Sequence, residues 1–384
     1  MSDNSFTEVS TESWFGRIGG AFKGILIGGV MFLLSFIILW VNEGRAVKTR
    51  KSLEEGESRV VAVSCEKVDP ANDGKLVHMT GEAATGEVLR DPVFGVEAQA
   101  VKLKRTVEMF QWVEHQEKTS KKKLGGKKET TTKYTYSKEW SGKPISSGSF
   151  KKPENHENPG EFPYTANEVS AKKVTLGAFV LSPGLIGQMR DFVPLDVAKD
   201  TPVPEGIDGK VKVSGGGFYI GKKPSDPKVG DVRVKFMVVK PGTLSVIAQQ
   251  TGDTFQPAPT KAGNPIEMLS AGRLSAVEMF QKAQEANKMM TWLLRLVGFL
   301  VMGFGLSLVF RPLSVIADVV PFIGSVVGAG TGFVAFLIAA GLSLVTIALA
   351  WLAYRPVFAG ILFAVVAALV VLLVMKLKKG KAKQ

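Results

Sequence analysis

The sequence predicts a multi-pass α-helical membrane protein with a large β-rich α+β extramembrane domain inserted between the first and second transmembrane helices. Long uncharged stretches lie only near the two ends of the 384 residues, which predicts membrane helices there. Charged residues occur throughout residues 44–290, and apolar residues in that region often alternate with polar ones, as in strands. A segment of that length can bury a core of its own.

The first span is predicted at residues 23–41. Residues 24–42 carry no charge, and about 20 such residues let a helix cross the hydrocarbon layer. A cleaved signal peptide has a shorter apolar region followed by a small-x-small site, whereas Glu43-Gly44-Arg45 follows here. We therefore expect an uncleaved anchor. Residues 1–22 are predicted to form an amphipathic segment, because their apolar residues recur at helical spacing.

The second span is predicted at residues 292–310, bounded by Arg311-Pro312. Ser275 and Glu278 ahead of it have the spacing of a capping box. Apolar residues follow at helical spacing up to the span. The pattern predicts one long helix that leaves the soluble domain and enters the membrane.

The remaining membrane segments are less regular. Residues 319–354 contain no charge, and Pro321 with several glycines interrupts their first half. We expect an interfacial or re-entrant segment at residues 313–332, a third span at 333–353 and a fourth at 357–375. The lysine-rich tail at 376–384 indicates the cytoplasmic side. An even number of spans then puts both termini on that side and residues 45–290 on the other, as an extracytoplasmic domain.

The central domain is predicted to be mainly strand. The run at residues 100–116 places Val101, Leu103, Val107, Met109 and Val113 on one face. Two further strands, in "VGDVRVKFMVVK" and "GTLSVIAQQTG", are expected to form a hairpin that turns at Pro241-Gly242. Residues 118–132 are predicted to be a loop, and residues 182–192 a short helix.

Glycines recur at every fourth position before and within the first span, and again near the other end of the chain. Small residues at this spacing let a second helix backbone approach closely. We expect a helix-packing face, either within the chain or between copies of a homo-oligomer. Its residues are Gly16, Gly20, Gly24, Gly28, Gly324, Gly328 and Gly332.

The net charge of +13 indicates an anionic partner. The neighbouring spans favour membrane lipid over nucleic acid, and we expect no nucleic acid among the partners. Residues 118–138 hold eight lysines against one glutamate. We predict lipid headgroup contacts from Lys121, Lys122, Lys123, Lys127 and Lys128.

The sequence offers no motif for catalysis, so we expect no enzyme and no cofactor. "GGFYIGK" at residues 216–222 resembles a phosphate-binding loop but lacks the following Ser or Thr. The three histidines have no second metal ligand at a suitable spacing. Cys65 is the only cysteine, which excludes an intrachain disulfide, and a small buried residue is expected. Charges in the last third fall at predicted span ends, which argues against a transporter.

Several stretches resemble the transmembrane protein 43 family, also called LUMA. They are Asn42, Glu43, Gly44, Arg45 and Ala46 after the first span, "AVKLKRTVEMFQWVE" at 100–114, "VGDVRVKF" at 229–236, "SAVEMF" at 275–280, and Tyr354, Arg355 and Pro356. The resemblance implies four spans, cytoplasmic or nucleoplasmic termini, a lumenal domain, and a self-associating protein that organises membrane protein complexes. It implies no catalytic residues. Missing glycosylation sequons and a short N-terminus favour a bacterial member.

The sequence thus predicts a non-enzymatic membrane scaffold that acts through helix packing, self-association and a β-rich domain apposed to the membrane. The alternative is a lipid-binding or lipid-domain-organising protein, and a membrane enzyme or transporter is a weaker hypothesis. Partners are expected to be lipids, other membrane proteins and copies of itself. The location is the bacterial inner membrane with a periplasmic domain in a bacterium, or endoplasmic reticulum and inner nuclear membrane in a eukaryote.

Overall fold

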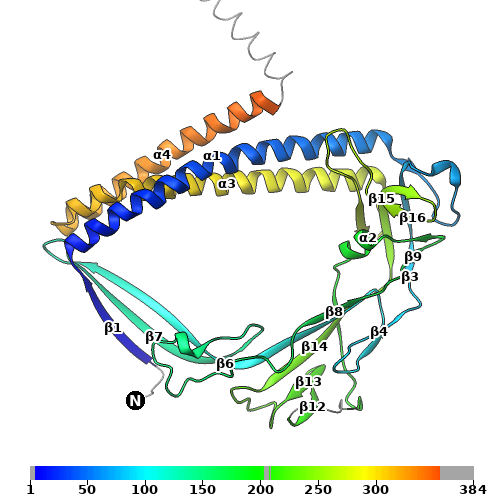
Figure 1. Ribbon diagram of the computed structural model, residues 1–384, viewed down its shortest axis with the longest axis horizontal. Helices are drawn as coiled ribbons and strands as arrows, with labels where there is room; N and C mark the ends of the chain where they lie inside the picture. The colour runs from blue at the N-terminus through cyan, green and yellow to red at the C-terminus, as the bar shows by residue number, and fades with distance from the viewer. Residues whose placement is uncertain (1–4, 203–206, 208, 355–384) are drawn as a thin grey trace, which may run out of the picture.

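The computed structural model describes residues 5–202, 207 and 209–354. Three long helices lie side by side above a β-rich domain (Figure 1). They are α1 (Trp14–Arg59), α3 (Ala276–Ala317) and α4 (Pro321–Tyr354), and the short α2 (Pro183–Gln188) belongs to the domain. All three long helices are long and apolar enough to cross a membrane. Two short 3₁₀ turns, Pro70–Asn72 and Ser147–Ser149, complete the helices of the described residues.

The N-terminus of each of the first two long helices is capped by a serine. The Ser13 hydroxyl accepts a hydrogen bond from the Gly16 amide at 3.1 Å. At α3, the Ser275 hydroxyl accepts from the Glu278 amide, and the Glu278 carboxylate accepts from the Ser275 amide. The capping box predicted from the sequence is therefore confirmed. The single helix predicted to leave the domain and enter the apolar segment is confirmed as well.

Eight strands of the described chain form the larger sheet, in the order β1-β7-β6-β14-β13-β12, with β11 on β14 and β8 on β6. The strands β6 and β7 form a hairpin much longer than the others, and β1 pairs antiparallel with its outer strand. Their bounds are β1 (Ser5–Glu12), β6 (Lys102–Lys122), β7 (Lys128–Ser141), β8 (Asn167–Ser170), β11 (Val193–Leu195), β12 (Val211–Ser214), β13 (Gly217–Ile220) and β14 (Val232–Val239).

A second sheet of seven described strands follows the order β10-β9-β3-β15-β16, with β17 on β15 and β2 on β3. The remaining two described strands, β4 and β5, pair with each other. Their bounds are β2 (Val61–Ala62), β3 (Leu76–Ala84), β4 (Val88–Arg90), β5 (Glu97–Gln99), β9 (Thr175–Leu176), β10 (Phe179–Val180), β15 (Thr243–Thr251), β16 (Thr254–Gln256) and β17 (Met268–Ala271).

The predicted hairpin at Pro241-Gly242 is wrong. The strands exist, but β14 pairs with β6 in one sheet and β15 pairs with β3 in the other. The short Pro-Gly connection therefore carries the chain between sheets. The Gly242 carbonyl accepts a hydrogen bond from the Ala83 amide at 2.9 Å, so it already joins the second sheet.

The lysine-rich segment also differs from the prediction. β6 continues to Lys122 and β7 begins at Lys128, so the loop is much shorter than residues 118–132. The hairpin is rich in threonine and lysine, and residues 115–121 of β6 are exposed, whereas the facing part of β7 is mostly half-buried beside β1. Within it, β7 has a strand partner on both edges, β6 on one side and β1 on the other, so its backbone hydrogen bonds are satisfied without an apolar face.

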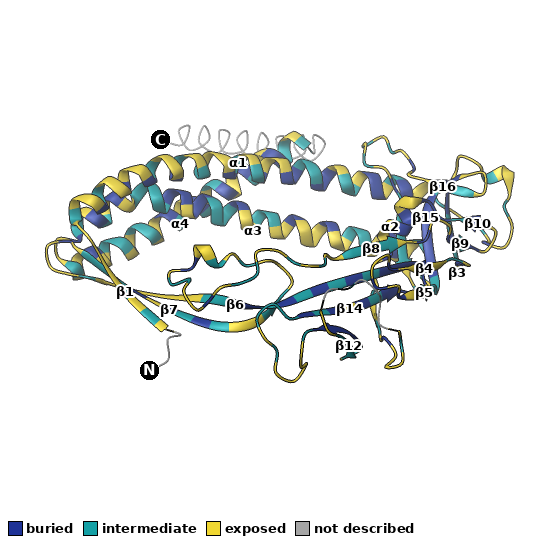
Figure 2. Ribbon diagram, turned by 60° about the horizontal axis from the view of Figure 1, so that its bottom comes forward, coloured by how far each residue is buried: buried dark blue, intermediate teal, exposed yellow. Residues whose placement is uncertain are grey.

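Two apolar clusters hold the domain together. The larger one fills the space between the sheets, with Leu103, Phe218 and Phe236 fully buried. The smaller one joins the polar halves of α1 and α3 to the second sheet, where Leu53 and Phe280 pack with Ile247. Figure 2 shows this burial in the domain and the mostly exposed surface of the helices. The helices therefore grow directly out of the domain core.

The structure divides the membrane segments differently from the sequence-based boundaries. The predicted span at 292–310 lies within α3, which continues through Pro312 to Ala317. The chain then turns at residues 318–320, and α4 covers most of the segment 313–332 together with 333–353. Ahead of the span at 23–41, residues 1–22 contain β1 and the start of α1. The predicted span 357–375 and tail 376–384 lie outside the described residues.

Candidate membrane-coupling site

The backbones of α1 and α3 approach each other closely at Gly28 and Gly305. A Cβ atom on Gly28 would lie 2.5 Å from the Gly305 carbonyl oxygen, and one on Gly305 would lie 2.8 Å from the Gly28 oxygen. Both glycines thus remove side chains that would hold the helices apart. The apolar cluster around Leu39 and Met302 fills the rest of this contact.

The other glycines of the predicted helix-packing face, which recur at every fourth position in α1 and in α4, have different neighbours. Gly24 also faces α3, with the Leu308 carbonyl 3.9 Å from a built Cβ, whereas Gly16 and Gly20 face Ser13 and Glu12. In α4, Gly324 is crowded by Asp318, Gly328 approaches Ser314, and Gly332 has no neighbour within 4 Å of a built Cβ. Gly24 and Gly28 therefore pack on α3, and of the α4 glycines Gly328 approaches α3 at a different place, near Ser314.

A buried polar cluster, the proximal junction, ties α1, α3 and α4 together near the domain. Its centre is Glu43, whose side chain has no exposed surface. The Glu43 carboxylate accepts two hydrogen bonds from Arg295, from Nε at 2.7 Å and Nη2 at 2.9 Å. It also accepts one from Trp351 Nε1 at 2.7 Å. A buried carboxylate needs this number of donors, because desolvation of an unpaired charge is costly.

The rest of the proximal junction lies on the neighbouring turns of α1 and α3. Asn42 Nδ2 donates to the Thr291 carbonyl at 3.0 Å, and Arg45 donates to the side chains of Asn287 and Thr291, each at 3.0 Å. Asn287 in turn donates to the Ala46 carbonyl at 3.0 Å. Asn42, Glu43 and Arg45, the polar residues of the "NEGRA" motif at 42–46, therefore all bind α3.

The Gly44 position of the same motif faces α4. A Cβ atom there would lie 2.7 Å from the Tyr354 ring. Tyr354 also contacts Trp40, with ring centroids 5.9 Å apart. Arg355 and Pro356, the other residues of the "YRP" stretch, lie outside the described residues.

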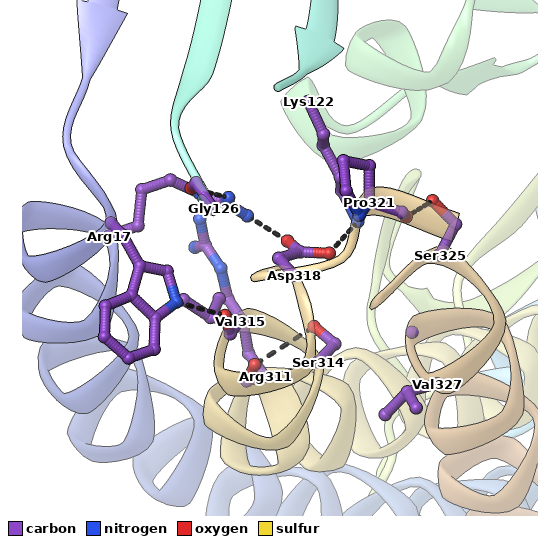
Figure 3. Close-up of polar contacts among 12 residues, drawn as sticks. Arg17, Lys122, Gly126, Arg311, Ser314, Val315, Asp318, Pro321, Ser325 and Val327 are labelled. Atoms are coloured by element: carbon purple, nitrogen blue, oxygen red, sulfur yellow. Dashed lines mark hydrogen bonds and ion pairs between the residues drawn. The ribbon is translucent and has the colours of Figure 1, made fainter. Parts of the chain in front are cut away.

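A second polar cluster, the distal junction, lies at the other end of the apolar segments (Figure 3). Asp318, in the turn between α3 and α4, is almost fully buried and forms ion pairs with Arg17 of α1 and with Lys122. The Lys122 Nζ lies 2.6 Å from the Asp318 carboxylate. Arg17 also donates to the Gly126 carbonyl at 2.6 Å. Three parts of the chain thus meet at one carboxylate.

Two further contacts close the distal junction. Trp14 Nε1 donates to the Val315 carbonyl at 2.8 Å, and the Gly125 amide donates to the Val319 carbonyl at 3.1 Å. Gly126, whose φ of +75° favours glycine, lies against the Trp14 ring. The tip of the β6–β7 hairpin is therefore seated on the ends of the helices.

Of the five lysines predicted to touch lipid headgroups, Lys122 binds Asp318 and Lys123 forms an ion pair with Glu129 at 3.2 Å. Lys121 and Lys127 are exposed, and Lys128 is half-buried. These lysines lie at the hairpin tip, beside the start of α1. Exposed cations at this level can reach anionic headgroups.

Sequence reasoning missed the distal junction and the strand β1. The only signal for β1 was composition, since "SFTEVSTE" contains β-branched and aromatic residues and is rich in Ser and Thr, as is its partner β7. The Phe6 ring packs on Tyr134, with centroids 6.0 Å apart, and Lys152 lies over it. Asp318 itself was noted only as a charge at the end of a span.

The other candidates for chemistry have ordinary surroundings. Cys65 is buried, as expected, and burial raises the pKa of its thiol. His115 bonds to Ser137 and Glu139 on the exposed hairpin, and the His156 ring stacks on Tyr136. Within the described residues, His, Cys, Asp and Glu form no group of three that could hold a metal ion.

The fold and the two junctions define an integral membrane protein in which the polar ends of long apolar helices pack into the core of a β-rich domain. The chain belongs to the transmembrane protein 43 family. The family profile, described as Transmembrane protein 43, matches residues 109–356. This confirms the family indicated by the sequence motifs.

Animal relatives align with most of the chain. It is 39% identical to rat (Rattus norvegicus) Transmembrane protein 43 over 358 residues, which cover 90% of this chain and 88% of the rat protein. It is 38% identical to the human (Homo sapiens) protein over 367 residues, covering 92% and 90%. The Drosophila melanogaster homolog is 30% identical over 341 residues, covering 86% and 89%. No solved structure matches the chain.

Proposed function

We propose that this protein is a non-enzymatic membrane scaffold that organises membrane proteins or membrane structure through its helices and its β-rich domain. The observation that carries the proposal is the continuity of helices and domain. Leu53 of α1 and Phe280 of α3 belong to the cluster that also contains Leu76 and Ile247 of the second sheet. A protein or lipid held by the helices is thereby held at a fixed position relative to the domain.

The apolar surface of the helices supports a role in binding other membrane components. Leu26 and Phe15 on α1 are 75% and 78% exposed, and α3 and α4 expose similar side chains. Lipid covers such a surface, and helices of other copies or other proteins can pack on it. The scaffold is proposed to act in the inner membrane of a bacterium, or in the endoplasmic reticulum and inner nuclear membrane of a eukaryote.

Cross-linking in native membranes tests the scaffold. In a Cys65→Ala background, Leu26→Cys places a thiol on the outward face of α1, and Ala21→Cys places one on the buried face as a control. Self-association or a bound partner predicts oxidative cross-links from Leu26→Cys and none from Ala21→Cys. If neither variant cross-links, and mild-detergent purification with mass spectrometry recovers a monomer without partner proteins, the scaffold proposal is wrong.

A lipid-organising role is the second candidate, and an apolar groove between α1 and α4 favours it. The groove has a volume of about 440 Å³, and Phe36, Trp40, Val345 and Leu349 are among its lining residues. Its shape and apolar lining suit an acyl chain. Val345→Trp should fill the groove and remove a lipid that co-purifies with the wild type. Leu337→Trp, outside the groove and already exposed, is the matched control.

A further inference from the structure

Helices α3 and α4 leave a groove between them, separate from the groove between α1 and α4. Its volume is about 300 Å³, and Leu296 and Phe299 of α3 with Ala340 and Leu344 of α4 are among its apolar lining residues. Arg295 lines the groove as well, on the side towards the domain. An apolar groove with a cation at one end matches the two chemical halves of a phospholipid.

The hydrogen-bond donors of Arg295 are only partly used. A guanidinium has five N–H donors. Glu43 accepts from Nε and Nη2, and no other residue of the described chain accepts from this guanidinium. The Arg295 side chain is only 13% exposed, so bulk water does not surround the remaining donors. Because charged donors left unpaired at a buried site are costly, an acceptor from outside the chain is expected here.

Two tryptophans fix where the guanidinium of Arg295 lies. Its Cζ atom is 4.7 Å from the centroid of the Trp292 ring and 5.6 Å from that of the Trp351 ring. Trp292 is also 68% exposed. Since tryptophans collect where hydrocarbon meets the headgroups, these rings place Arg295 at the depth of lipid phosphate and ester groups.

A second cation lies on the same face of α3. Lys288 comes four residues before Trp292 and seven before Arg295, which is the spacing of one helix face. At a rise of 1.5 Å per residue, it lies about 10 Å nearer the domain than Arg295. Lys288 is exposed, and no carboxylate of the described chain pairs with it. Glu285, the next acid on this face, is exposed and lies roughly one turn further from the groove.

The proximal junction adds to the positive charge. Arg45 binds only uncharged side chains, those of Asn42, Asn287 and Thr291. Glu43 is thus the one carboxylate among the described groups that bind these two arginines. The guanidinium groups of Arg45 and Arg295 outnumber it, and a neighbouring anion would be attracted to the excess.

We propose that the groove between α3 and α4 binds an anionic glycerophospholipid. One acyl chain lies along Leu296 and Phe299, and the phosphate lies between Arg295 and Lys288. The phosphate oxygens accept from the unpaired donors of Arg295, in the charge-assisted hydrogen bonds that arginine forms with phosphate. The inference requires only that the apolar helices lie in lipid, and it depends neither on the scaffold nor on the groove between α1 and α4.

Lipid binding to the full chain in mild detergent tests the headgroup. After bound lipid is removed, native mass spectrometry compares the uptake of phosphatidylglycerol with that of phosphatidylcholine carrying the same acyl chains. We expect tighter binding of phosphatidylglycerol. Lys288→Gln should weaken it roughly fivefold. Lys282→Gln, an exposed position on another face of α3, is the matched control. Equal uptake of the two lipids, or equal binding by the two variants, would overturn the proposal.

A pair of substitutions in α4 tests the position of the acyl chain. Ala340→Phe places a ring in the groove and should weaken phosphatidylglycerol binding at least roughly tenfold. Ala348→Phe makes the same change at an exposed position that does not line the groove, and should bind as the wild type does. Unchanged binding by Ala340→Phe would show that the lipid lies elsewhere.

The same variants separate this inference from the proposed function. Ala340→Phe should leave the cross-link from Leu26→Cys intact, because the two positions lie on different helices and only one lines the groove. If Ala340→Phe instead converts a dimer into a monomer and leaves phosphatidylglycerol binding unchanged, a second copy occupies the groove and the lipid site is wrong.

Discussion

The proximal and distal junctions both bury a carboxylate and join separate parts of the chain, but they do so with different partners. The proximal junction joins three helices through Glu43 and Arg295, and its main partners lie within regular helix turns that pack over a long distance. The distal junction joins a helix start, a turn and a hairpin tip at the single carboxylate of Asp318. The first is supported by helix packing on every side, and the second by a few contacts.

The difference indicates which junction can open. Breaking the proximal junction leaves a charge inside a packed bundle, so the helices themselves must separate. Breaking the distal junction frees a hairpin tip whose β6 strand is already exposed over residues 115–121, and Lys122 can return to water. We therefore expect the proximal junction to set global stability and the distal junction to set local opening.

The largest effect is expected from Glu43→Ala. The substitution leaves Arg295 buried without its counter-ion, and such losses cost about 3–5 kcal/mol. Thermal unfolding in mild detergent measures it. Glu54→Ala is the matched control, because the Arg50–Glu54 pair on the same helix is exposed and a surface pair contributes about 0–1 kcal/mol. Equal melting temperatures for the two variants would show that the proximal junction does not hold the bundle.

The next effect separates two neighbouring glycines of α1. Gly28→Ala places a Cβ against Gly305 and Leu308 of α3 and should cost about 1–3 kcal/mol through overpacking. Gly29→Ala meets no atom within 4 Å and should be neutral or stabilising, since alanine favours the helix by about 1 kcal/mol. Unfolding in detergent compares them. A Gly29→Ala variant that loses as much stability as Gly28→Ala would contradict the packing face.

A smaller and local effect is expected at the distal junction. Lys122→Gln removes one of the two cations at Asp318 and should weaken tip closure by about 1–2 kcal/mol. Hydrogen exchange should become faster in residues 120–130 and in β1, with little change in the domain core. Lys121→Gln, whose side chain points to solvent on the neighbouring position, is the control. Faster exchange throughout the molecule would mean that the distal junction is not a separate unit.

The smallest effect concerns pH and β1. The hydrogen bond from Lys151 holds the pKa of Glu8 below its ordinary value of 4.5. A depressed carboxyl pKa contributes stability above the ordinary value, and this is lost as pH falls through the lowered pKa. The protection of the β1 amides, measured relative to their intrinsic exchange rates at each pH, should therefore fall below about pH 4.5 and be constant from pH 6 to 8. Glu8→Gln should remove the acid dependence, and if it persists the cause lies elsewhere.

The predictable parts of the fold are those that a local pattern encodes. Residues 292–310 are apolar in sequence and helical in the structure, and the Ser275 capping box follows directly from two residues three apart. The alternation of Leu103, Val107 and Met109 likewise gives the buried face of β6. In each case the neighbours that decide the structure lie within one or two turns or strand repeats.

The missed parts depend on contacts between distant residues. Nothing near Asp318 in sequence indicates that Arg17, 301 residues away, is its partner. The Pro241-Gly242 turn misled because a Pro-Gly pair specifies a change of direction and not the strand that the chain pairs with next. The lysine-rich segment 118–132 was misassigned because its composition indicates exposure, and exposed lysines occur both in loops and on the solvent-facing side of a hairpin.

The continuity of α1 from lipid-facing residues to Leu53 in the domain cluster has a mechanical consequence. A helix of 46 residues is about 69 Å long, and its bending stiffness is supplied along much of that length by α3 beside it. Thickening, thinning or bending of the lipid layer acts on the apolar half as a torque. The other half of α1 is fixed in the domain, so that torque rotates the β-rich domain as one body. The helix pair then transmits a change of membrane shape to the molecules that the domain binds.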